Sequence, residues 1–161
     1  MDIILQLQAG AELVLAGILS MLIGLDRERR HRPAGMRTHM LVGIGACLFT
    51  VLSMHAFPGD DSSRVAANIV TGVGFLGAGT IIQHKRDVFD LTTAASIWAV
   101  AAVGMAVGSG FWFLAILATL IIWTVLAVLR RFQAKDDDWR RYSRPGTPAQ
   151  GRPSVADREQ Q

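Results

Sequence analysis

The chain alternates long apolar blocks with short polar connections. Blocks of about 18 or more residues with few charges are typical of membrane-spanning helices. Five mostly apolar blocks occupy residues 3–25, 40–57, 65–83, 91–108 and 111–129. The pattern therefore predicts an all-α polytopic membrane protein built as a bundle of five transmembrane helices.

The basic residues are concentrated in alternate connections. The first connection, 26–37, holds five arginines, the third holds two basic residues, and eight more follow residue 129. The second connection holds only Arg64 among basic residues, and the fourth, 109–110, holds none. Lys and Arg accumulate on the cytoplasmic side of membrane proteins. We therefore predict five spans with the N-terminus outside and the C-terminus in the cytoplasm.

Composition adds limits on domain organisation and chemistry. At 161 residues there is room for one folded domain. Residues 1–132 form the predicted transmembrane domain, and the polar segment 133–161 is predicted to be a disordered cytoplasmic tail. A single cysteine, Cys47, excludes a disulfide framework and a cysteine-based metal motif. The net charge of +3 follows from the membrane topology and does not indicate nucleic-acid binding.

The third block is rich in small residues. In lipid, such residues let two helices approach closely. We therefore predict a helix-packing seam, within the bundle or between two protomers, formed by Asn68, Thr71, Gly72, Gly74, Gly77, Ala78 and Gly79. The run 72–77 also matches the dinucleotide-binding fingerprint, but that motif requires a βαβ unit. The flanking membrane-length apolar runs favour helix packing.

Polar residues gather at the predicted cytoplasmic ends of the first, second and fourth spans. Ionisable side chains within or close to the membrane cost free energy, and their presence therefore suggests a function. The predicted functional polar site comprises Asp26, Glu28, Arg37, Thr38, His39, Thr92 and Thr93. Ordinary ion pairing among charges at the membrane surface is the structural alternative.

Two of these residues are also candidate metal ligands. Mg²⁺ prefers oxygen ligands and takes one or two carboxylates while keeping most of its waters. Asp26 and Glu28 therefore form a candidate magnesium site, whereas His39 alone is a poor basis for zinc. The sequence shows no nucleophile with a base, no phosphate loop with lysine and no paired-histidine motif. We predict that the protein is not an enzyme and needs no cofactor, with Mg²⁺ as the one candidate ligand.

Several ordered motifs resemble the MgtC/SapB family of bacterial inner-membrane proteins. The resemblance covers roughly residues 10–129, and it is carried by Gly24-Leu25-Asp26-Arg27-Glu28, Gly35-Met36-Arg37-Thr38-His39, Ala66-Ala67-Asn68-Ile69-Val70, Gly72-Val73-Gly74-Phe75-Leu76-Gly77-Ala78-Gly79, Leu91-Thr92-Thr93-Ala94-Ala95 and Trp98. Family members usually have glutamate where this chain has Asp26. Longer members carry a folded cytoplasmic C-terminal domain, and the tail of this chain is too short and polar to be one.

The resemblance implies a membrane domain, forming a homodimer in the lipid bilayer of the inner membrane, that is linked to adaptation to low magnesium and, in pathogens, to virulence. It implies a regulatory or adaptor protein that acts on a membrane partner such as the F-type ATP synthase. The alternative is a transporter or channel for magnesium or another cation. We rank the adaptor first, because the sequence offers no ladder of carboxylates for a conduction path.

Overall fold

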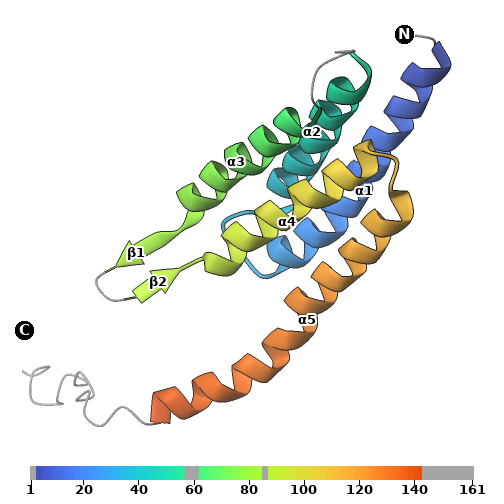
Figure 1. The fold of residues 1–161 in the computed structure, drawn as a ribbon. Helices are drawn as coiled ribbons and strands as arrows, with labels where there is room; N and C mark the ends of the chain where they lie inside the picture. Colours follow the sequence, from blue (N-terminus) through green and yellow to red (C-terminus); the bar gives the residue numbers. More distant parts are fainter. Residues whose placement is uncertain (1–2, 57–61, 85–86, 143–161) are drawn as a thin grey trace, which may run out of the picture. The chain divides into compact units, whose positions relative to one another are not determined.

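The computed structural model describes residues 3–56, 62–84 and 87–142 (Figure 1). These residues form α1 (Ile3–Arg29), α2 (Met36–His55), α3 (Ser62–Thr80), α4 (Leu91–Gly108) and α5 (Trp112–Tyr142). A short antiparallel hairpin, β1 (Ile82–His84) with β2 (Asp87–Phe89), connects α3 to α4. The all-α class of the membrane protein is confirmed, and the hairpin is a small addition where we expected a plain polar turn.

The helix ends differ from the predicted spans at several points. α3 covers 62–80 where we predicted 65–83, since Ile82 and Gln83 belong to β1, and α5 continues past the predicted end at residue 129.

The first connection is also shorter than predicted. α1 extends four residues past residue 25, and α2 begins four residues before residue 40. The polar residues that we assigned to a loop therefore lie on helical turns. α4 has the predicted bounds, because Gly110 adopts a positive φ of 79° and ends the helix. The N–H of Phe111 donates to the carbonyl oxygen of Ala106 across this turn.

Three helices in the described part of the chain, α1, α2 and α4, are long and apolar enough to cross a membrane. α3 is 19 residues long, but its glycines, its hydroxyl side chains and Arg64 make it less apolar. The apolar part of α5, Trp112–Val128, is shorter. Five spans and their orientation therefore stay predictions.

The chain divides into two units, one ending at Ala127 and one beginning at Val128. Within the second unit α5 continues to Tyr142, so residues 133–142 of the predicted tail are helical. Residues 130–142 contain no Gly or Pro and several good helix formers, which accounts for the continuation. The rest of the predicted disordered tail, 143–161, lies outside the described residues.

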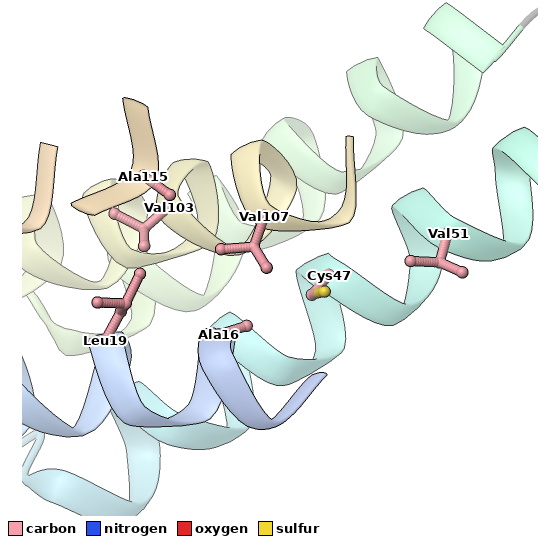
Figure 2. Packing of buried hydrophobic residues seen from close by; sticks show 7 residues of the cluster. All are labelled: Ala16, Leu19, Cys47, Val51, Val103, Val107 and Ala115. Carbon is pink, nitrogen blue, oxygen red and sulfur yellow. The ribbon is translucent and has the colours of Figure 1, made fainter. Parts of the chain in front are cut away.

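In the first unit α4 packs against α1, α2 and α3 (Figure 1). Two clusters of buried apolar side chains lie along it. Figure 2 shows the first cluster, which joins α1, α2, α4 and the start of α5 through Ala16, Leu19, Cys47, Val51, Val103, Val107 and Ala115. The second joins α2, α3 and α4 through Ala34, Ala46, Ile69, Val73, Ile97 and Ala101. Most of these side chains are small, which allows close helix packing.

The closest helix contacts occur at glycines outside the third block. A Cβ placed on Gly104 of α4 would collide with the carbonyl oxygen of Gly43 in α2. A Cβ on Gly108 would lie 2.6 Å from the carbonyl oxygen of Cys47, and one on Gly24 would lie 2.7 Å from the Cα of Met36. These glycines let α2 approach both α1 and α4 with backbone against backbone.

The predicted seam on α3 packs only in part within this chain. A Cβ on Gly77 would lie 3.4 Å from the carbonyl oxygen of Ala94, in ordinary contact with α4. Nothing lies within 4 Å of a Cβ on Gly72, Gly74 or Gly79. The other three seam positions are exposed: Asn68, Thr71 and Ala78. Within the bundle the seam reduces to Gly77, and a seam between protomers stays a prediction.

Candidate functional site

The end of α1 is a left-handed turn that positions two arginines. His31 has a φ of 52°. Its N–H donates to the carbonyl oxygen of Glu28 at 2.9 Å, and the N–H of Arg32 donates to that of Arg27 at 3.1 Å. This pair of bonds is the Schellman pattern that commonly ends helices, with histidine in the position usually held by glycine. Arg27 thus lies on the last helical turn and Arg32 just beyond it.

Arg27 is a buried charge between α1 and α4. It is 3% exposed, and its Nη2 donates to the Oγ1 of Thr93 at 2.8 Å. The Thr93 hydroxyl donates in turn to the Oδ1 of Asp90 at 3.3 Å. The Nη1 of Arg32 lies 3.7 Å from the same oxygen. Two guanidinium groups therefore share one carboxylate, one of them through a hydroxyl.

Asp90 is placed for this role by its backbone. It adopts left-handed angles, with φ 63° and ψ 21°, directly before α4. Its carbonyl oxygen accepts hydrogen bonds from the N–H groups of Thr93 at 3.0 Å and Ala94 at 3.1 Å. Its side chain does not cap the helix, so the carboxylate is free to meet the Thr93 hydroxyl and Arg32.

His39 ties the start of α2 to α4. Its side chain is fully buried, and Nδ1–H donates to the carbonyl oxygen of Gly35 at 2.8 Å. Its Nε2 lies 3.1 Å from the Oγ of Ser96, and this hydroxyl donates to the carbonyl oxygen of Thr93 at 2.8 Å. We call the whole set the buried polar cluster: Arg27, Arg32, His39, Asp90, Thr93 and Ser96.

Only two residues of the predicted polar site, His39 and Thr93, belong to the buried polar cluster. Asp26 accepts hydrogen bonds from the Nε of Arg30 with both oxygens, at 2.8 and 2.9 Å, on its own helix. The Oε2 of Glu28 accepts from the N–H of Met36 at 2.8 Å, which satisfies one free donor at the start of α2. The remaining three are exposed: Arg37, Thr38 and Thr92.

The contacts of Asp26 and Glu28 bear on the candidate magnesium site. Both carboxylates are engaged by protein groups, a guanidinium in one case and a backbone N–H in the other. The described residues contain no group of three or more His, Cys, Asp and Glu side chains that could hold a metal ion. Mg²⁺ at Asp26 would have to compete with Arg30 for the carboxylate, and the site stays a prediction.

Sequence reasoning missed four members of the cluster: Arg27, Arg32, Asp90 and Ser96. A signal existed for Arg27, because Ser20, Ile23 and Gly24 are buried and recur at helical spacing with it. Continuing α1 by one turn would have placed Arg27 on that buried face. We had instead counted it among the loop arginines.

The described residues also form an apolar groove outside this cluster. It has a volume of about 540 Å³ and runs between α2 and α3. Asn68 is the single polar side chain among the residues that line it. This groove offers no series of charged groups along its length.

Comparison with known proteins places these features in a family. The sequence profile of the MgtC family matches residues 13–135. The chain is 43% identical over 127 residues to the putative magnesium transporter YhiD of Escherichia coli (strain K12), covering 74% of this chain and 59% of that protein. It is 48% identical over 118 residues to protein MgtC of Brucella abortus (strain 2308), covering 72% of this chain and 50% of that protein.

A third relative is protein SrpB of Synechococcus elongatus, 42% identical over 136 residues, with 75% of this chain and 74% of that protein covered. The chain thus spans only about half to three-fifths of the length of the YhiD and MgtC proteins. No solved structure matches. The match covers α2, α3 and α4 in full and the part of α1 that carries Arg27. The chain belongs to the MgtC family.

Proposed function

We propose that this chain is a non-enzymatic, multi-pass protein of the bacterial inner membrane that acts in adaptation to low magnesium. It serves as a regulator or adaptor for a membrane partner, for which the F-type ATP synthase is the candidate. Family membership and the magnesium-related name of the relative YhiD support the link to magnesium. The cytoplasmic placement of its acting surface rests on the positive-inside rule.

The observation that carries the proposal is the arrangement at one end of the bundle. The buried polar cluster holds the end of α1 and the starts of α2 and α4 together. Around it, Arg37, Thr38 and Thr92 are exposed, and Asp26 is held at the edge by Arg30. A polar surface on a firmly packed base is suited to binding a partner, which favours an adaptor.

Substitution at Asp26 tests this proposal. Asp26→Asn removes the charge and keeps the shape, and we expect the variant to accumulate in the membrane yet fail to support growth in magnesium-poor medium. The matched control is Arg30→Gln, which breaks the same ion pair but leaves the carboxylate. The pair is part-buried, with 11% of the Asp26 side chain and 32% of the Arg30 side chain exposed. An i,i+4 pair on a helix contributes only about 0.3–0.5 kcal/mol when exposed, and loss of this one pair should not unfold the protein. Equal growth of both variants with the wild type would refute a functional role for Asp26.

The transporter remains the second candidate, because YhiD carries the name of a putative magnesium transporter. Purified protein in phospholipid vesicles with a trapped magnesium-sensitive dye separates the two functions. The adaptor should give no flux above protein-free vesicles, while it should retain the F-type ATP synthase when captured from detergent-solubilised membranes. Magnesium flux that scales with the amount of protein would establish the transporter instead.

A further inference from the structure

The α1–α2 connection, taken with the adjoining helix turns as residues 26–37, carries more positive charge than its carboxylates offset. It holds Arg29, Arg30, Arg32 and Arg37, in addition to the buried Arg27. Its two carboxylates are already engaged, one by Arg30 and the other by the backbone of α2. In the portions of the chain that the structure describes, Arg29 and Arg37 form no ion pair. This end of the bundle therefore attracts anions.

Arg32 differs from the other arginines of this connection. Its Nε is buried and has no hydrogen-bond partner among the described residues. Its contact with Asp90, at 3.7 Å, is longer than a hydrogen bond. Asp90 also accepts from the Thr93 hydroxyl that serves Arg27, so this carboxylate is divided between two cations. A third of the Arg32 side chain, 34%, is accessible from outside.

An arginine whose hydrogen-bond donors are only partly satisfied is suited to binding a phosphate group. The planar guanidinium presents its donors as a rigid fork that matches phosphate oxygens. The connection joins two helices long enough to span a membrane, and the predicted topology places it at the level of the lipid headgroups. Basic pockets between spanning helices at that level bind anionic headgroups. We propose that Arg32, assisted by the positive charge of the α1–α2 connection, binds a phosphate group, either in the headgroup of an anionic phospholipid or as free phosphate.

The full chain in zwitterionic detergent allows a direct test. Native mass spectrometry would measure binding of phosphatidylglycerol, of phosphatidylcholine and of inorganic phosphate in separate titrations. We expect phosphatidylglycerol to bind at least fivefold more tightly than phosphatidylcholine if the source is a lipid, and inorganic phosphate to compete if it is the free anion. Equal binding of the two lipids together with no binding of inorganic phosphate would overturn the proposal.

Two substitutions that each remove one positive charge localise the site. Arg32→Gln should weaken binding tenfold or more. Arg37→Gln should weaken it by about fivefold or less, the contribution of one basic residue to general attraction near an anionic surface. Arg32→Lys keeps the charge beside Asp90 but lacks the fork-shaped guanidinium. Its affinity should lie between those of the wild type and Arg32→Gln. Because it keeps the charge, this variant tests the geometry even if Arg32→Gln folds poorly. Equal losses in Arg32→Gln and Arg37→Gln would mean general attraction only, and would also overturn the proposal.

This inference does not depend on the proposed adaptor function. Phosphate binding is measured on the purified chain, whereas the adaptor is measured by growth and by capture of a partner. Loss of lipid selectivity in Arg32→Gln with unchanged growth in magnesium-poor medium would support the site and separate it from that function.

Discussion

The contact between Gly104 and Gly43 makes a quantitative prediction about how the bundle is held together. Gly104→Ala adds a single methyl group to α4 at the point where it meets the carbonyl oxygen of Gly43. The Cβ would also lie 3.0 Å from the carbonyl carbon and 3.1 Å from the Cα of Gly43. All three atoms belong to the backbone of α2, so no side-chain rotation can relieve the collision. The two helices would have to move apart.

The expected loss of stability follows from two opposing contributions. Overpacking in a tightly packed core costs about 1–3 kcal/mol, and a contact with backbone belongs at the upper end of that range. Alanine is favoured over glycine inside a helix by about 1 kcal/mol. The net loss in the free energy of unfolding is therefore about 2 kcal/mol. For a chain of this length, this corresponds to a fall in Tm of about 4–8 °C.

Thermal denaturation in detergent, followed by size-exclusion chromatography, measures the change. The matched control is Gly74→Ala on α3, where nothing lies within 4 Å of the added Cβ. The control receives only the helix-propensity gain, so its Tm should stay constant or rise. If Gly104→Ala is as stable as Gly74→Ala, the backbone approach of α2 and α4 is not as close as described, and the reasoning fails.

Three further predictions address the cluster, the seam and the topology. Thr93→Val removes the acceptor of Arg27 and should lower the free energy of unfolding by about 1–3 kcal/mol, whereas exposed Thr92→Val should change the Tm little. Gly77→Leu should destabilise the chain in detergent by crowding α4, and Gly74→Leu should leave the monomer unchanged, so a change in its oligomeric state alone would reveal a seam between protomers. A reporter fused after Arg131 should be cytoplasmic and one inserted between α2 and α3 external, and finding both on one side would exclude five spans.

The broad fold could be predicted because membrane helices are encoded by the length of apolar blocks. The bounds of α4 were predicted correctly, since Ser109 and Gly110 interrupt the pattern there. The closest helix contacts could not be predicted in the same way. Glycine content singled out α3, but a glycine marks a close approach only if a neighbouring helix faces it. Gly104 and Gly108 lie four residues apart on α4, a spacing typical of close helix contacts, but only the arrangement in space pairs Gly104 with Gly43 of α2.

The site was predicted by region more successfully than by residue. The predicted membrane depth of each residue pointed to the ends of the first, second and fourth spans, and the cluster does lie there. Depth cannot distinguish the inner from the outer face of a helix end. Asp26 and Arg27 are adjacent, yet Asp26 pairs along its own helix while Arg27 is buried against α4. A helix boundary misplaced by one turn was enough to exchange their expected roles.

The placement of charge within the bundle supports a function at this end. A buried arginine is costly, and replacing a buried ion pair by apolar residues is often neutral or stabilising. Stability alone therefore gives little reason to bury Arg27 against Thr93, whose hydroxyl donates in turn to Asp90. The same contacts fix how far α1 and α4 can slide past each other, because each bond requires one register. A partner or a phosphate group that bound the α1–α2 connection would then contact a rigid surface. Binding at this surface would explain why the protein bears the cost of a buried arginine.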